Sequence, residues 1–330
     1  MTPSPAAAPA AGEEPRTTGG GPVLRVEGLS VRFRMPAGRH VEAVTGATFA
    51  LAPGESLALV GESGCGKSVL ASALLGLLPG NAETAGSARL ADGLDLLAAD
   101  ERTLARSVRG RRIGLVPQSP AAHLTPVRTV RSQLEETVRE LTGTRPPALR
   151  AAAEAAAGRA AFPASHLDRH PHELSGGLAQ RAATALALVG GAPLLLADEP
   201  TTGLDRDLAR RTVDELRAHT RADGRALLVI THDLVAAERI ADTVAVMYAG
   251  RLVEIAPAGS FFGRRGPRHP YSRGLLDALP ERAFIPVPGA PPELGALPPG
   301  CAFAARCPAA DLPCRTRRPA LTEGVACHHA

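Results

Sequence analysis

The chain has 330 residues, of which 45% are hydrophobic and 21% charged, a balance that indicates a folded protein of roughly two domains and excludes a fibrous or wholly disordered one. The formal net charge is +4, but the arginines are scattered and only 3% of the residues are aromatic, so we expect no nucleic-acid partner. No apolar stretch reaches the roughly 18 to 20 residues that cross a bilayer, which predicts a chain that does not span a membrane.

The first 22 residues differ in composition from the rest of the chain. They are rich in Ala, Pro, Gly and Thr, contain Glu13 and Glu14, and have neither a basic start nor an apolar signal core. We therefore predict that residues 1–22 are a disordered tail on a cytosolic protein.

A phosphate-binding loop is predicted between a strand at residues 56–60 and a helix from Ser68 to Gly76. The connecting run fits the pattern G-x-x-x-x-G-K-[ST]. Lys67 is the only lysine, since the other 36 of the 37 Lys and Arg residues are arginine, which indicates a site that needs a compact ammonium group. We expect Lys67 to reach the β and γ phosphates of ATP and Ser68 to hold Mg²⁺. The predicted ATP-binding residues of this loop are Gly61, Glu62, Ser63, Gly64, Cys65, Gly66, Lys67 and Ser68.

Cys65 allows two interpretations. The positive end of the helix that follows could lower the pKa of its thiol and make it reactive. Alternatively, Cys65 fills a position that accepts any small residue. Protection of Cys65 from alkylation by ATP would favour the first interpretation.

Two carboxylates end a second apolar strand, at residues 194–199. A buried parallel strand would bring Asp198 and Glu199 to the sheet edge beside the phosphate loop. Because neighbouring residues on a strand point in opposite directions, the two acids can have different roles. We expect Asp198 to bind Mg²⁺, directly or through water, and Glu199 to polarise the water that attacks the γ-phosphate.

A second anion site is predicted where another helix begins. Ser175 can cap this helix, and Gly176 and Gly177 expose its first N–H groups. Together with the loop and the Asp198–Glu199 strand, the run at residues 174–181 resembles the signature sequence of ATP-binding cassette (ABC) ATPases.

The resemblance extends over roughly residues 23–257 and implies a fold. It implies an α/β nucleotide-binding domain of the P-loop NTPase type, with a mixed sheet core and an antiparallel β subdomain. Residues 119–172 match the helical subdomain of the family. The pair Pro146-Pro147 interrupts this helical stretch.

The resemblance also assigns further site residues. Gln118, after a strand at residues 113–117, matches a catalytic glutamine that contacts Mg²⁺ and senses the membrane subunits. His232, after a strand at residues 226–230, matches the histidine that contacts the γ-phosphate. Asp205 matches a loop that crosses the dimer interface.

Two further residues complete the predicted ATP site. Phe33 lies where such proteins stack an aromatic ring on adenine, although a phenylalanine in an alternating strand equally suits the core. Gln180 belongs to the signature run and is included with it.

The family mechanism implies partners. Two such domains face head to tail, so ATP on the Lys67 loop of one chain is closed over by the Ser175 segment of the other. ATP closes the pair, hydrolysis reopens it, and the movement passes to membrane subunits. The implied partners are a second ATPase chain, two transmembrane permease subunits and an extracytoplasmic solute-binding protein.

A small C-terminal module is predicted at residues 258–330, where the composition changes to Pro, Arg and Cys. Its Arg-His-Pro-Tyr run at residues 268–271 and its Pro-Gly-Cys and Arg-Cys-Pro runs resemble the C-terminal extension of dipeptide and oligopeptide importer ATPases. Nickel-carrying and glutathione-carrying relatives share this extension.

Four cysteines lie in this module, at Cys301, Cys307, Cys314 and Cys327. Disulfides are not expected beside a cytosolic ATP site, and the spacing lacks the C-x₂-C pairs of most zinc ribbons. Three interpretations stay open: a [4Fe–4S] cluster, which some members of the importer family carry here, zinc with His328 or His329 as a substitute ligand, and free thiols.

We therefore expect an ATP-hydrolysing subunit, peripheral on the cytoplasmic face of the cell membrane, that powers import of dipeptides, oligopeptides or related small solutes. The alternatives are nickel or glutathione import, an exporter or drug-resistance subunit, and a non-transport ABC ATPase acting on DNA or ribosomes. A single cassette without a heptad run argues against the last, and the Arg-His-Pro-Tyr run argues against an exporter. The segment Ser119–Pro126 departs from the importer pattern, so the permease and the solute stay open.

Overall fold

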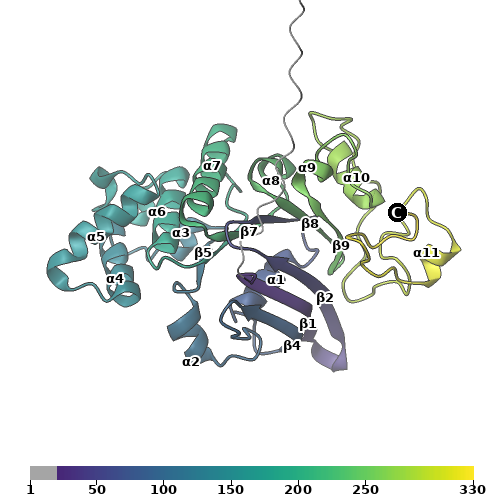
Figure 1. The fold of residues 1–330 in the computed structure, drawn as a ribbon, viewed down its shortest axis with the longest axis horizontal. Coiled ribbons are helices and arrows are strands. Elements are labelled where there is room, and N and C mark those ends of the chain that lie inside the picture. Colours follow the sequence, from purple (N-terminus) through teal and green to yellow (C-terminus); the bar gives the residue numbers. More distant parts are fainter. Residues whose placement is uncertain (1–20) are drawn as a thin grey trace, which may run out of the picture.

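The computed structural model describes residues 21–330, so the predicted tail lies outside the described residues apart from its last two positions. The chain folds into two sheets surrounded by helices (Figure 1). The strands are β1 (Leu24–Arg34), β2 (His40–Leu51), β3 (Ser56–Val60), β4 (Ala82–Leu90), β5 (Ile113–Val116), β6 (Leu194–Asp198), β7 (Ala226–Thr231), β8 (Thr243–Tyr248) and β9 (Arg251–Pro257). The helices are α1 (Lys67–Leu74), α2 (Glu101–Thr103), α3 (Pro120–His123), α4 (Val130–Thr142), α5 (Pro146–Arg159), α6 (Gly176–Leu188), α7 (Arg206–Asp223), α8 (Leu234–Ile240), α9 (Ala258–Phe261), α10 (Pro270–Asp277) and α11 (Leu312–Thr316).

The larger sheet has the strand order β5-β6-β7-β3-β8-β9. All of its neighbouring strands are parallel except β8 and β9, which are antiparallel. The smaller sheet, β2-β1-β4, is antiparallel throughout. This arrangement confirms the predicted α/β fold with a mixed sheet core and an antiparallel β subdomain.

The central strands are apolar because both faces of the larger sheet are covered. All five residues of β3 and all six of β7 are buried. Along β6, Leu194 and Leu196 pack with α1 and the small sheet, whereas Leu195 and Ala197 pack with the helical subdomain. Opposite faces of one strand therefore join the sheet to two different subdomains.

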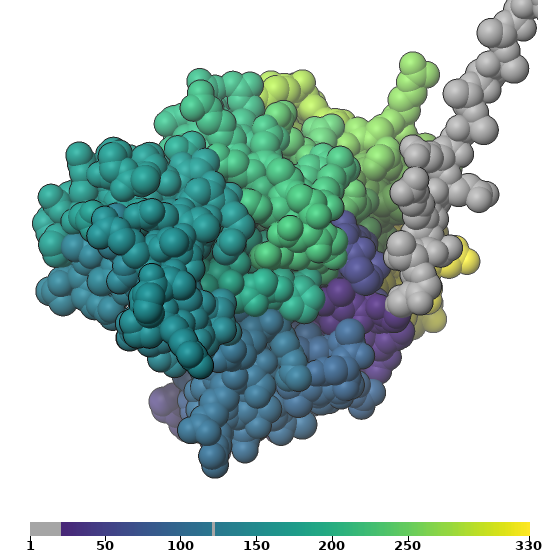
Figure 2. All heavy atoms as spheres, turned by 60° about the vertical axis from the view of Figure 1, so that its left-hand side comes forward, coloured from purple at the N-terminus to yellow at the C-terminus, as the bar shows by residue number. Residues whose placement is uncertain are grey.

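The helical subdomain, α3 to α6, lies at one end of the molecule and the C-terminal extension lies at the other (Figure 1). In the space-filling view the helical subdomain forms a teal lobe beside the green central part (Figure 2). Helix α4 ends at Gly143, which takes a left-handed conformation, and α5 begins at Pro146. The proline pair therefore starts a second helix, since proline suits the first helical turn.

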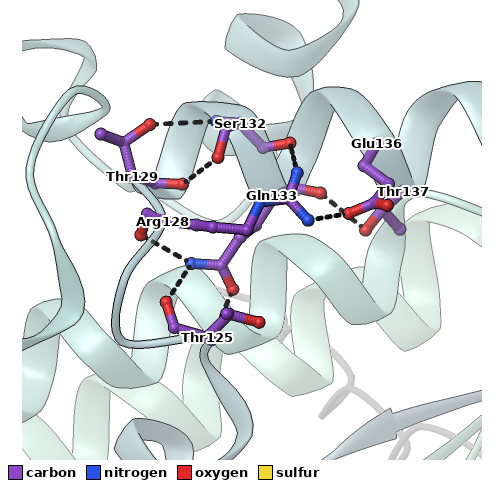
Figure 3. A network of polar contacts seen from close by, with 7 residues as sticks. All are labelled: Thr125, Arg128, Thr129, Ser132, Gln133, Glu136 and Thr137. Carbon is purple, nitrogen blue, oxygen red and sulfur yellow. Dashed lines mark hydrogen bonds and ion pairs between the residues drawn. The ribbon is translucent and has the colours of Figure 1, made fainter.

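The chain between Gln118 and α4 is tied to α4 through the side chains of Gln133 and Arg128, the latter bonded to Ser132 O and Glu136 (Figure 3). The Gln133 amide accepts a hydrogen bond from Thr125 N at 2.8 Å and donates to the carbonyls of Thr125 at 3.2 Å and Arg128 at 3.0 Å. Thr129 caps α4 by accepting from Ser132 N at 3.3 Å. This segment is thereby fixed to the helical subdomain.

The C-terminal extension shares a hydrophobic core with the large sheet. Val244 and Val246 of β8 pack in one cluster with Phe261, Tyr271 and Phe303. The boundary predicted at residue 258 thus falls within a continuous core. Within residues 21–330, none of the helices is long and apolar enough to cross a membrane.

We predict that Gly114→Ala destabilises the chain by about 1–3 kcal/mol, as overpacking does. A Cβ at Gly114 on β5 would lie 2.6 Å from Ala187 O in the backbone of α6, so the helix must move. Gly158, near the end of α5, meets nothing within 4 Å and is the matched control. Gly158→Ala should stabilise by up to ~1 kcal/mol. Urea denaturation of both variants measures this, and an unchanged midpoint for Gly114→Ala would contradict the packing argument.

Candidate active site

The predicted phosphate loop joins β3 to α1 and is wedged between two other strands. Gly61 has φ +152° and Gly66 has φ +107°. A Cβ at Gly61 would lie 2.2 Å from Met247 O on β8, and one at Gly66 would lie 2.3 Å from Ala43 O on β2. Only glycine fits these two positions, because both the backbone angles and the space exclude a side chain.

The Lys67 side chain folds back onto the loop. Its Nζ donates to Gly61 O at 2.7 Å and to Glu62 O at 3.1 Å, and the residue is 6% exposed. The loop carbonyls thus hold the only lysine of the chain at the centre of the loop.

Cys65 is buried in the same loop, and its burial raises the pKa of the thiol, an effect that the nearby Lys67 charge opposes. The interpretation of Cys65 as a residue with a lowered pKa is therefore wrong. The desolvation of the thiolate outweighs the positive charges around it. The structure favours the interpretation of Cys65 as a small, buried residue that fills space in the loop.

Asp198 ends β6 opposite the first turn of α1. Ser68 Oγ donates to Asp198 Oδ1 at 3.3 Å. Burial raises the pKa of Asp198, the Ser68 hydrogen bond opposes this, and the negative charge of Glu199 adds to it. A partly desolvated carboxylate beside a hydroxyl is an oxygen pair that suits a hard divalent cation.

Glu199 is held in a left-handed backbone conformation, with φ +49°. Its N–H donates to Ile230 O on β7 at 2.8 Å. Its Oε2 lies 2.8 Å from His232 Nδ1 and accepts from Thr202 Oγ1 at 3.2 Å. Glu199 is 7% exposed, whereas the His232 side chain is 56% exposed. Two neighbours therefore orient the carboxylate while the histidine faces solvent.

A pocket of about 270 Å³ brings seven of the predicted ATP-site residues together. The phosphate loop, Gln118 and Glu199 line this pocket. Gln118 follows β5 and is exposed. Leu294 of the C-terminal extension also lines it, which the sequence did not predict because a proline-rich stretch carries no signal for such a contact. The lining residues are Ser63, Gly64, Gly66, Lys67, Ser68, Val69, Gln118, Glu199 and Leu294.

The signature residues lie apart from this pocket and do not line it. Ser175 caps α6 by accepting from Leu178 N at 3.4 Å, and Ser175 and Gly176 are exposed. At Gly177 a Cβ would lie 2.5 Å from Leu208 Cδ2 of α7. The exposed start of α6 thus lies outside the pocket around Lys67 of its own chain.

The remaining predicted residues also lie outside the pocket lining: Gly61, Glu62, Cys65, Asp198 and His232, described above, and Gln180, Asp205 and Phe33. Gln180 is 3% exposed, and its Nε2 has no hydrogen-bond partner among the described residues. Asp205 caps α7, accepting from Asp207 N at 3.1 Å and Leu208 N at 3.0 Å. Phe33 is partly buried against the core of the small sheet. Their predicted contacts with ATP stay predictions.

The four C-terminal cysteines line one small pocket, together with His328 and His329. No disulfide joins any of these four cysteines. Burial raises the pKa of Cys301 and of Cys314. Cys314 Sγ lies 3.5 Å from His329 Nε2, and Asp311 completes a group whose three ligand atoms lie within 4.8 Å of one another. The fold therefore gathers residues that are separate in the sequence into one set of metal-ligand types.

The fold and the site define an ATP-binding cassette, and comparisons with known proteins agree. Residues 44–202 match the family model for the ABC transporter, and residues 253–314 match that for the oligopeptide/dipeptide transporter C-terminal region. Among solved structures, a dimeric ATP-binding cassette bound to ADP and Pi has a TM-score of 0.64 at 24% identity, covering 71% of this chain and 98% of that chain. The cassette cbiO1 of Clostridium perfringens has a TM-score of 0.63 at 25% identity, covering 74% and 92%.

Relatives of known name are more similar in sequence. The oligopeptide transport ATP-binding protein OppD of Mycobacterium tuberculosis is 41% identical over 94% of this chain, which spans only 51% of that protein. A putative peptide import ATP-binding protein of Brucella melitensis is 40% identical over 93% of this chain and 95% of its own length. The dipeptide transport ATP-binding protein DppD of Bacillus subtilis is 37% identical over 91% of each chain.

The chain belongs to the ABC transporter ATP-binding family, in the branch with the oligopeptide/dipeptide C-terminal region. This confirms the resemblance drawn from the motifs. The chain spans about half the length of the mycobacterial relatives that it matches.

We predict that Asp198→Asn stabilises the chain at pH 7 in the absence of divalent cations. Folding raises the pKa of Asp198, so above the unfolded pKa the ionised carboxylate lowers the free energy of unfolding. The neutral amide of Asn removes this loss of stability. The gain shrinks as the pH falls toward about 4, because Asp198 itself then becomes neutral. Thermal unfolding in EDTA across this pH range measures the effect. Asp214→Asn is the control of opposite sign, because Arg239 lowers the pKa of Asp214. A lower melting temperature for Asp198→Asn at pH 7 would contradict the argument.

Proposed function

We propose that this chain binds and hydrolyses Mg²⁺-ATP as the ATPase subunit of an ABC importer for dipeptides, oligopeptides or related small solutes, at the cytoplasmic face of the membrane. The observation that carries the ATPase assignment is the pocket in which Lys67, Gln118 and Glu199 meet. The peptide assignment rests on the names of the relatives and on the C-terminal region that this chain shares with their family.

The phosphate loop would hold the β and γ phosphates of ATP. Its backbone N–H groups and the start of α1 form an anion site, and the Lys67 ammonium would exchange its loop carbonyls for phosphate oxygens. Ser68 and Asp198, already 3.3 Å apart, fit a Mg²⁺ ion, with Gln118 as a further oxygen donor. Bound Mg²⁺ would neutralise charge on the phosphates.

Glu199 would act as the base that orients and polarises the attacking water. Its buried carboxylate is already oriented by Thr202 and by His232. His232 is exposed enough to turn from Glu199 toward a γ-phosphate. The positive φ of Glu199 is a strained conformation, which typically persists where the chemistry requires it.

A second ATPase chain would complete the site. The N-terminus of α6 at Ser175 is exposed and lies outside the pocket of its own chain, so an ATP bound at Lys67 needs the Ser175 segment of another chain to cover it. We include Gly176, Gly177, Gln180 and Asp205 in that interface. Two permease subunits and a solute-binding protein complete the proposed importer, and Val127, 80% exposed beyond Gln118, suits a permease contact.

We further propose that the four C-terminal cysteines hold a [4Fe–4S] cluster. Four thiols that line one pocket fit the donor set of such a cluster. Zinc held by Cys314, His329 and Asp311, and free thiols, are the alternatives that the same geometry allows.

Metal analysis of anaerobically purified protein tests this proposal. We expect about four irons per chain and charge-transfer absorption, both lost in Cys314→Ser, because each thiolate is a ligand. Cys65→Ser is the control, since Cys65 lies in the phosphate loop. Zinc without iron would favour the second alternative, and absence of both metals would leave free thiols.

For the ATPase itself, we predict that Glu199→Gln retains ATP binding and lowers turnover by at least about 100-fold, the usual effect of losing a general base. Lys67→Ala should lose ATP binding. Nucleotide titration and phosphate release measure the two effects, with Glu140→Gln on the exposed side of α4 as the control. Steady turnover by Glu199→Gln would remove Glu199 as the base.

The importer assignment is tested by purifying the Glu199→Gln variant together with the proteins bound to it. Tagged Glu199→Gln, extracted gently from its own membranes with Mg²⁺-ATP, should retain its partners because it does not hydrolyse the nucleotide. We expect two permeases and a second ATPase chain. Ribosomal or DNA-repair proteins without a membrane subunit would overturn transport and leave the ATPase chemistry standing.

A further inference from the structure

We propose that Arg306 and Tyr271 of the C-terminal extension are positioning residues for the phosphate loop and act through Glu62. This inference rests on the proposed function of the loop as the ATP site. It makes the extension a working part of that site.

Glu62, the second residue of the loop, is paired with an arginine 244 residues away in the sequence. Arg306 Nη1 donates to Glu62 Oε2 at 2.7 Å and Arg306 Nη2 donates to Oε1 at 2.9 Å. This two-pronged geometry fixes the direction of the carboxylate as well as its distance. The Arg306 side chain is only 4% exposed and that of Glu62 is 27% exposed, so water screens the pair weakly.

Arg306 is itself anchored on its other sides. Its Nε donates to Pro288 O at 2.7 Å, and its Nη2 donates to Val287 O at 3.3 Å. Its Nη1 also lies 3.3 Å from the hydroxyl of Tyr248 on β8, to which it donates. The guanidinium therefore has a fixed position before it meets the loop. Lysine could not reproduce this, because it lacks the planar fork.

Tyr271 holds the backbone of the same loop residue. Its hydroxyl accepts a hydrogen bond from Glu62 N at 2.9 Å, and its ring is fully buried against Tyr248 and Phe303. The Glu62 carbonyl in turn accepts from Lys67 Nζ at 3.1 Å. Side chain, N–H and carbonyl of Glu62 are thus all bonded, and contacts run without a gap from the extension to the phosphate-binding lysine.

The proline-rich segment of the extension lies against the same loop. Pro291, Pro292 and Leu294 share a small pocket with Glu62 and Ser63, and Leu294 also lines the larger pocket around Lys67. Arg306 immediately precedes Cys307, which lines the cysteine pocket. One short segment therefore faces both the cysteine group and the ATP site.

If Arg306 is removed, Glu62 keeps a partly buried charge without a partner. An unpaired buried charge costs free energy, and the loop would lower that cost by turning the carboxylate toward water. This turn would move the Glu62 backbone and the carbonyl that holds Lys67. Nucleotide binding would weaken because the loop would no longer be ordered in advance. A purely structural arginine would lower stability and leave nucleotide affinity alone.

The test compares Arg306→Met, Arg306→Lys, Glu62→Gln and the Arg306→Met/Glu62→Gln double variant in the full chain. Dissociation constants for Mg²⁺-ADP and Mg²⁺-ATP are measured by titration, with KM and kcat for ATP where the chain turns over. Arg225→Met is the matched control. Arg225 is also buried and pairs with Asp223 at 3.0 Å, but it precedes β7 at the sheet edge opposite the loop.

We expect Arg306→Met and Glu62→Gln each to weaken binding of both nucleotides about tenfold, the scale of one lost charged hydrogen bond. KM for ATP should rise more than kcat falls. The double variant should bind no more weakly than the weaker single one, because both changes break the same link. Arg306→Lys should restore affinity only in part, and Arg225→Met should lower the melting temperature with affinity unchanged.

Wild-type affinity in both Arg306→Met and Glu62→Gln, or losses that simply add in the double variant, would overturn the inference while leaving the ATPase proposal intact. If Arg306→Met does not fold, Glu62→Gln decides, because it keeps the shape of the side chain. A wild-type chain that binds neither nucleotide would overturn the proposed function and this inference with it.

Discussion

The packing of the phosphate loop against the backbone of two strands is the constraint on which the site depends. Gly61 meets Met247 O on β8 and Gly66 meets Ala43 O on β2, each at a distance that admits no side chain. The loop therefore has one path between β3 and α1. Its carbonyls hold the side chain of the only lysine of the chain, beside the N–H groups that we propose bind phosphate.

The parallel direction of the central strands brings the chemical groups together. Strands β3, β6 and β7 end at the same sheet edge, and the loop, Asp198 with Glu199, and His232 follow these ends. Gln118 follows β5 at that edge and begins the segment that Gln133 ties to α4. This segment joins the pocket directly to the helical subdomain.

The site contains charged groups whose burial costs free energy of folding. Burial raises the pKa of Asp198, and Arg306 donates to both carboxylate oxygens of the partly buried Glu62. Burying such groups does not favour stability in itself, but it fixes the direction of their side chains, as the proposed binding of a cation and phosphates would require. The C-terminal extension contributes to this arrangement from a core that it shares with β8.

The sequence by itself determined the elements that local chemistry dictates. The strand predicted at residues 56–60 is β3, and the helix predicted from Ser68 begins at Lys67, because apolar runs, glycines and a helix start are local signals. It also predicted the Asp198–Glu199 strand end and the family. Contacts between distant segments were decided only by the tertiary structure. The Glu62–Arg306 pair, the burial that raises the pKa of Cys65, and the place of Leu294 at the pocket depend on which surfaces pack together, and no local pattern encodes that.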